Sequence, residues 1–292
     1  MMKKLFWKLQ NSKWMHTPPA VFFKSCIVHQ INRTSAALAY YFLISFFPLL
    51  LFITLLLSEI SENLDLSQLI SGNVIPADIL TTIVSLLNYS SSLSRQTLMI
   101  TALVLSVYGG SRAVACLSMA INRAYHLEKK RNAFLQLLIN FAFSALFLLA
   151  LVFTLVVVVS TPEVLGFLQG AFGIDALGMS IYFYLRFILI LVVFLFLLVI
   201  LYSVVPNRRF KFRQAFPGAL AASVGWVVVS MAFSLYVSNI GRYSLLYGTI
   251  GAIVVLMLWL YFTGMVLVAG SEFNYLVMRL RQKKNLHADD QI

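Results

Sequence analysis

Residues 132–162 read NAFLQLLINFAFSALFLLALVFTLVVVVSTP and contain no aspartate, glutamate, lysine or arginine. An α-helix rises about 1.5 Å per residue, so about 20 apolar residues cross the roughly 30 Å of hydrocarbon in a bilayer. The stretch is longer than this requirement. It therefore predicts a membrane-spanning helix, and it sets the class of the whole protein.

Four further runs lack all four charged residue types: 34–58, 187–207, 214–241 and 243–271. A weaker candidate begins at Gln96, is interrupted by Arg112 and resumes its apolar character to Ile121. Together these runs predict an all-α membrane protein with about six transmembrane helices, near residues 36–57, 97–119, 135–159, 181–204, 216–238 and 248–270.

The composition of the whole chain agrees with a membrane protein. Of its 292 residues, 61% are hydrophobic and 11% are charged, whereas soluble domains carry about 25% charged residues. No stretch has the mixed polar composition that a soluble domain needs. Cys26 and Cys116 lie far apart in apolar surroundings, so they indicate neither a zinc site nor a disulfide framework.

The basic residues predict the orientation in the membrane. Segments 1–34, 120–134, 205–215 and 271–292 together hold 18 of the 22 lysines and arginines. The positive-inside rule then places these segments, and both termini, in the cytoplasm. The net charge of +12 is spread along the membrane border. We therefore expect anionic lipid headgroups as partners and no nucleic acid.

Three parts follow from this arrangement: an interfacial amphipathic segment 1–33, a transmembrane domain 34–278 and a basic, polar cytoplasmic tail 279–292. Residues 3–15 suit a helix lying in the interface, and residues 20–33 a second helix leading into the first span. The longest external loop is 59–95. Its apolar stretch 79–93 is too short to span, so we expect it to lie on the outer surface.

Polar residues inside the spans are the candidate site. Arg112 follows Tyr108 and Ser111, and it either contacts an anion or polar partner or extends its side chain to the headgroups. The same alternatives hold for Arg186, nearer the outer end of its span. Glu272 pairs with an arginine of a neighbouring helix or caps a solvated helix end. Pro48, in the middle of the first span, predicts a kink.

Other patterns indicate packing and not chemistry. Gly218 with Ala222, and Ala221 with Gly225, have the small-xxx-small spacing of closely packed helices, for which ordinary bundle packing is favoured over dimerisation. The four histidines occur singly in the sequence, so no metal site is predicted. No phosphate-binding glycine loop and no nucleophile elbow occurs, so we expect no cofactor and no enzyme activity.

The sequence resembles the YihY/virulence factor BrkB family through an ordered set of motifs over residues 20–278. These are Ala36–Tyr41 with Ser45–Leu49, Ser111-Arg112, Ala120–Tyr125, Val205-Pro206-Asn207, Phe216–Ala219, Tyr247-Gly248 with Gly251, Trp259–Tyr261 and Gly270–Asn274. The glycines at 109 and 110 depart slightly from the pattern. The resemblance implies a six-span protein of the bacterial cytoplasmic (inner) membrane. Members have carried labels as serum-resistance factors and as ribonuclease BN, and the ribonuclease label has no metal ligands to support it here.

Two classes of function remain open. The first is transport, or assistance in transport, of a lipid or other amphiphilic anion for envelope assembly, and it draws on the arginines within spans and the basic border. The second is a scaffold that anchors an envelope protein partner and moves nothing. A small-solute or ion channel has less support, and whether the chain forms a homo-oligomer stays open.

Overall fold

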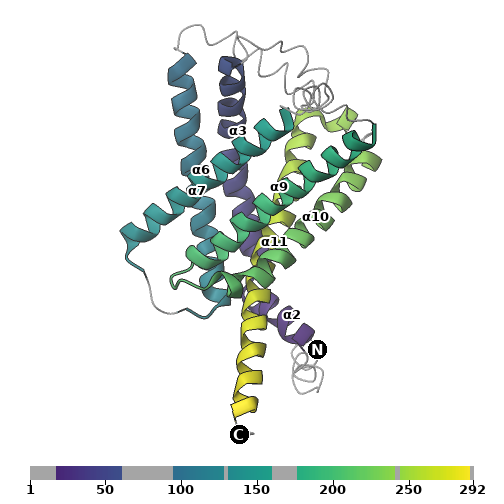
Figure 1. Cartoon of the computed structure of the whole chain (residues 1–292). Coiled ribbons are helices and arrows are strands. Elements are labelled where there is room, and N and C mark those ends of the chain that lie inside the picture. The colour runs from purple at the N-terminus through teal and green to yellow at the C-terminus, as the bar shows by residue number, and fades with distance from the viewer. Residues whose placement is uncertain (1–17, 61–94, 128–130, 160–175, 241–243, 290–292) are drawn as a thin grey trace. The chain divides into compact units, whose positions relative to one another are not determined.

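The computed structural model describes residues 18–60, 95–127, 131–159, 176–240 and 244–289. Over these residues the chain is helical (Figure 1), with the elements α2 (Pro18–Val28), α3 (Ile31–Ile60), α6 (Arg95–Ala124), α7 (Ala133–Val159), α9 (Ala176–Val204), α10 (Phe212–Ile240) and α11 (Ser244–Asp289). Six of them, α3 to α11, are long and apolar enough to cross a membrane. The prediction of six spans is confirmed.

The helices extend beyond the predicted limits, and α11 does so by the most residues. The apolar run predicts an end of the last helix near residue 270, but α11 continues to Asp289, a length of 46 residues. Lysine, arginine, glutamine and leucine follow the apolar run, and all of them favour helix. Helix α9 likewise begins at Ala176, before the predicted 181. The segments 3–15 and 79–93 lie outside the described residues.

A two-residue turn separates α2 from α3. Gln30 has a φ of 53°, in the left-handed region, and its backbone N–H donates to Ile27 O at 3.1 Å. The Gln30 side-chain oxygen accepts a hydrogen bond from Arg33 at 2.9 Å. No glycine or proline marks this turn, so the interruption was not predicted. It places His29 between the two helices.

Contacts divide the chain into two compact units. The first contains residues 1–40, 113–140 and 194–292, and the second contains residues 41–112 and 141–193. Within the first unit, α10 and α11 pack along each other (Figure 1), and α11 also contacts α2.

Small residues bring the helices of the first unit together. A Cβ added at Gly218 would overlap Gly270 O and the Asn274 side chain, so α10 and α11 touch backbone to backbone here. Gly225 faces Val266. The small-residue spacing on α10 therefore serves bundle packing, as its pattern predicts.

Asn274 stabilises the backbone of α10 near Pro217. Proline cannot donate a backbone hydrogen bond and disturbs the helix around it. Fully buried Asn274 accepts from the Gly218 N–H at 2.6 Å and donates to Ala215 O at 3.0 Å. One side chain of α11 thus satisfies two backbone groups on either side of the proline.

In the second unit, glycines let α6 approach two neighbours. A Cβ at Gly109 would lie 2.9 Å from Ser45 Cβ of α3, and one at Gly110 would overlap Ser144 Oγ of α7. Ser144 Oγ in turn donates to Val107 O at 3.0 Å. The departure from the family pattern at these two positions therefore has a packing role. Helix α3 runs unbroken through half-buried Pro48, and a kink there stays a prediction.

Candidate functional site

A pocket of about 370 Å³ lies in the first unit, where the end of α6, the α9–α10 linker and α11 meet. Its lining includes four cationic and three aromatic side chains: Arg208, Arg209, Lys211, Arg279, Tyr125, Phe210 and Tyr275. Within the described part of the chain, no aspartate or glutamate lines it. This basic pocket therefore concentrates positive charge, and its chemistry suits an anion.

The linker that carries the cations is held at several points. The Asn207 N–H donates to Asn122 Oδ1 of α6 at 2.8 Å, and the Phe210 N–H donates to Ser203 O at 3.0 Å. The ring of Phe210 packs edge-on against Tyr125, with centroids 4.7 Å apart. Arg208 and Arg209 consequently project from a fixed backbone.

The start of α10 adds to the positive potential. The Lys211 N–H donates to Gln214 Oε1 at 3.1 Å, which caps the first turn. The N-terminus of a helix carries a partial positive charge of its own. Nearby, burial lowers the pKa of Arg131, and the positive charge of Arg209 lowers it further. Cations around the pocket thus repel each other.

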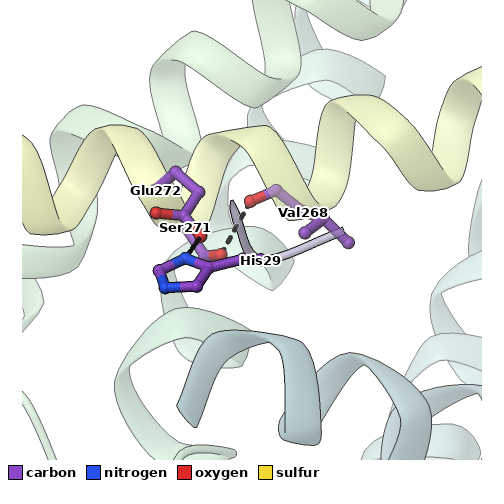
Figure 2. Close-up of polar contacts among 4 residues, drawn as sticks. All are labelled: His29, Val268, Ser271 and Glu272. Atoms are coloured by element: carbon purple, nitrogen blue, oxygen red, sulfur yellow. Dashed lines mark hydrogen bonds and ion pairs between the residues drawn. The ribbon is translucent and has the colours of Figure 1, made fainter. Parts of the chain in front are cut away.

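A buried pair of polar side chains, His29 and Glu272, lies in the same unit (Figure 2). Glu272 of α11 is 2% exposed, and its Oε1 lies 2.5 Å from Nδ1 of His29, in the turn between α2 and α3. The other oxygen, Oε2, is buried and has no hydrogen-bond partner among the described residues. Ser271, beside Glu272, donates to Val268 O at 2.7 Å.

Aromatic rings connect this pair to the basic pocket. The ring of His126 lies 5.4 Å from that of His29 and 5.0 Å from that of Tyr275, both edge-on. Tyr275 also lines the pocket. His126 follows the last turn of α6 with a φ of 51°, in the left-handed region typical of helix ends. Both histidines therefore occupy helix-end turns.

The other predicted site residues lie in the second unit. Arg112 is exposed and Tyr108 is 53% exposed, whereas Ser111 is buried and its hydroxyl donates to Tyr108 O at 2.7 Å. Arg186 is half-buried in α9. An anion-contacting role for these residues stays a prediction.

The two alternatives for Glu272 are both wrong. Its partner is His29 and not an arginine, and at 2% exposure it does not cap a solvated end. The error has a physical source. The apolar run ends at 270, so Glu272 is expected at a helix end, but α11 continues for more than four turns and α2 packs against it.

The sequence singled out Glu272, but neither its partner His29 nor the residues that line the pocket. The pocket cations were recognised only as part of the basic membrane border, and the histidines as isolated residues. The described residues include no group of three histidine, cysteine, aspartate or glutamate side chains that could hold a metal ion. The two cysteines are free.

Cys26 of α2 provides a solution test of this packing. Burial, and secondarily the charge of Glu272, raises the pKa of the Cys26 thiol from 9.0 to about 11. Its thiolate fraction at pH 8 is then about 100-fold below that of an ordinary cysteine. A more basic thiolate is the stronger nucleophile, and this offsets about tenfold of the loss in alkylation rate. We expect iodoacetamide to alkylate Cys26 about tenfold more slowly than a cysteine in an unfolded peptide, measured by mass spectrometry in detergent.

The variant Glu272→Gln is the control for this experiment. Removing the nearby negative charge lowers the pKa of Cys26 and speeds alkylation at pH 8. If Cys26 of the unsubstituted protein is alkylated as fast as a cysteine in an unfolded peptide, α2 is not packed as described.

Comparison with known proteins identifies the family. The family model for virulence factor BrkB matches residues 22–291. The ribonuclease-like protein YfkH of Bacillus subtilis is 30% identical over 265 residues, covering 89% of this chain and 94% of that protein. A UPF0761 membrane protein of Alteromonas mediterranea is 42% identical over 74 residues, and one of Chlorobium phaeobacteroides 34% over 87 residues.

The UPF0761 matches cover only 25% and 19% of those two proteins. No solved structure matches the chain. The resemblance seen in the sequence motifs is confirmed over most of the chain. The protein belongs to the virulence factor BrkB family of membrane proteins.

Proposed function

We propose that the protein transports, or assists the transport of, an anionic lipid or other amphiphilic anion for envelope assembly. The observation that carries this proposal is the exposed Arg112, a positive charge inside a span. Among the described spans, Glu272 is the only carboxylate, and it is paired with His29. A lipid phosphate would supply the negative charge that the spans lack.

The depth of Arg112 supports this role. Helix α6 has 30 residues, a length of about 45 Å. Arg112 lies 12 residues, or about 18 Å, from the end at Ala124. A helix centred on roughly 30 Å of hydrocarbon then holds Arg112 about 10 Å inside the apolar layer. An exposed arginine at this depth is costly unless an anion, water or a headgroup reaches it.

The membrane and the orientation belong to the same proposal. The protein resides in the bacterial cytoplasmic membrane with both termini in the cytoplasm, so the basic pocket faces the inner leaflet. The lipid headgroup moves along the polar positions of the bundle while its acyl chains stay in hydrocarbon. The protein is not an enzyme in this proposal, although the Bacillus relative carries a ribonuclease-like name.

The test is a lipid-movement assay with Arg112→Gln. The full chain is reconstituted into liposomes with fluorescent phosphatidylglycerol, and movement between leaflets is followed by quenching from outside. Charge-assisted hydrogen bonds contribute about 1.5–3 kcal/mol, so loss of the guanidinium should slow movement at least about tenfold. Arg112→Lys should retain part of the rate.

Arg123→Gln is the matched control, because Arg123 is exposed on the same helix but lies in its last turn. It should move lipid at the unsubstituted rate. The proposal fails if Arg112→Gln moves lipid as fast as the unsubstituted protein, or if that protein is no faster than empty liposomes. Absence of movement would turn attention to the scaffold hypothesis and to co-purifying envelope proteins.

A further inference from the structure

The four cations of the basic pocket lie at or close to the ends of three candidate spans. Lys211 directly precedes the span Phe212–Val237, and Arg279 lies within the final turn of the span ending at Gln282. Arg208 and Arg209 follow the end of another span, Val204, by four and five residues. The ends of spans border the hydrocarbon, where the phosphates of a bilayer lie, so these four positions suit a lipid headgroup.

The pocket provides more positive charge than a single negative charge requires. Four cations line it without a lining carboxylate among the described residues, and the N-terminus of α10 adds a partial positive charge. Burial is the main cause of the lowered pKa of Arg131, and repulsion from the pocket cation Arg209 is the second cause. An anion with two or more negative charges would relieve this repulsion.

Hydrogen-bond donors complete the arrangement. Arginines bind phosphate oxygens with paired N–H groups, and a lysine binds them as a point charge. The Gln214 side-chain oxygen accepts a hydrogen bond from the backbone N–H of Lys211. The side-chain NH₂ group of Gln214 can then donate to a ligand. Two tyrosines, Tyr125 and Tyr275, contribute ring surface around the cations.

We infer that the basic pocket of Arg208, Arg209, Lys211 and Arg279 binds a phosphate group that carries two or more negative charges. The phosphate belongs either to a lipid headgroup or to a soluble phosphate. Apolar surface beside the pocket suits a lipid, because Phe212 and Phe216, one turn apart on α10, are 59% and 47% exposed. As a loading site for a transported lipid, the pocket rests on the proposed function, but its binding of phosphate does not.

The experiment measures binding to the full chain in nanodiscs of phosphatidylcholine, which has no net charge. Phosphatidic acid is the lipid probe and pyrophosphate the soluble probe, with bound phosphatidic acid counted by native mass spectrometry and pyrophosphate measured by calorimetry. Arg279→Gln and Lys211→Gln should each weaken binding about tenfold or more.

Matched controls separate the pocket from general surface charge. Arg281→Gln and Arg213→Gln remove the same charge from exposed arginines two residues away on α11 and α10, and neither arginine lines the pocket. Both should change the affinity less than twofold. All four positions are exposed, so none of the substitutions should prevent folding.

Either probe can support the inference. Phosphatidic acid that millimolar pyrophosphate does not displace identifies a lipid headgroup, whereas saturable pyrophosphate binding that excludes the lipid identifies a soluble phosphate. The inference is overturned if the control variants weaken binding as much as the pocket variants, or if neither probe binds. Arg112→Gln should leave pocket binding intact. Pocket binding by an unsubstituted protein that moves no lipid would therefore overturn only the proposed function.

Discussion

Replacing Gly270 with leucine should destabilise the protein by at least about 3 kcal/mol, because α10 and α11 would no longer fit together. A Cβ at this position would lie 2.6 Å from Tyr202 Oη, 2.8 Å from Ala222 Cβ and 2.9 Å from Gly218 O. Two of these neighbours belong to the backbone or lie one bond from it. They cannot move without separating the helices.

Tyr202 adds a second cost. It is fully buried, and its hydroxyl donates to Leu267 O at 2.6 Å. A leucine at 270 would displace that hydroxyl and leave buried polar groups unsatisfied, which costs about 1–3 kcal/mol. Thermal unfolding in a mild detergent, followed by intrinsic fluorescence, measures the combined loss.

Gly225→Ala is the control for this prediction. Its added Cβ would lie 3.0 Å from Val266 Cγ1, the end of a side chain that can shift. The expected loss is below about 1 kcal/mol. If Gly270→Leu unfolds at the same temperature as the unsubstituted protein, the close packing of α10 on α11 is wrong.

The spans were predictable because each depends on local composition. A charge-free run longer than about 20 residues is helical in lipid whatever it packs against. Helix ends were less predictable. The end of α11 depends on helix propensity beyond the bilayer, and the turn at Gln30 has no glycine or proline to mark it.

The site was not predictable for a related reason. His29 and Glu272 are 243 residues apart, so only the packing of α2 on α11 brings them together. Arg279 lines the pocket from α11, but the helix predicted from the sequence ends near residue 270 and does not include Arg279. Counting charges along the sequence identifies the basic membrane border, but it does not show that four of these cations line one pocket.

Four of the family motifs that look scattered in the sequence meet in the first unit. Asn122, in one motif, binds the backbone of Asn207, in another. Asn274, in a third, binds the backbone of Gly218 in a fourth. These side chains hold the α9–α10 linker and the start of α10, the segments that carry three of the pocket cations. The motifs therefore describe the support of the basic pocket more than its ligands.

Replacing Glu272 with alanine should lower the free energy of unfolding by about 3 kcal/mol. His29 loses its partner, and the shorter side chain leaves a cavity. Removing one member of a buried pair costs about 3–5 kcal/mol. The His29 side chain is 16% exposed, so water can partly replace the lost partner, which places the cost at the lower limit. Glu272→Gln should cost only about 1 kcal/mol, because its amide oxygen can still accept from the imidazole.

A double-mutant cycle separates the pair interaction from packing. Glu272→Met and His29→Phe keep side-chain volume, and together they remove both polar groups. Buried ion pairs replaced by apolar residues of similar volume are often neutral or more stable. The free energy of unfolding should fall by about 2–3 kcal/mol in each single variant, and by at most about 1 kcal/mol in the double variant. Thermal unfolding in the same detergent measures all four proteins. Losses that simply add would show that His29 and Glu272 do not interact, and α2 would then lack its polar attachment to α11.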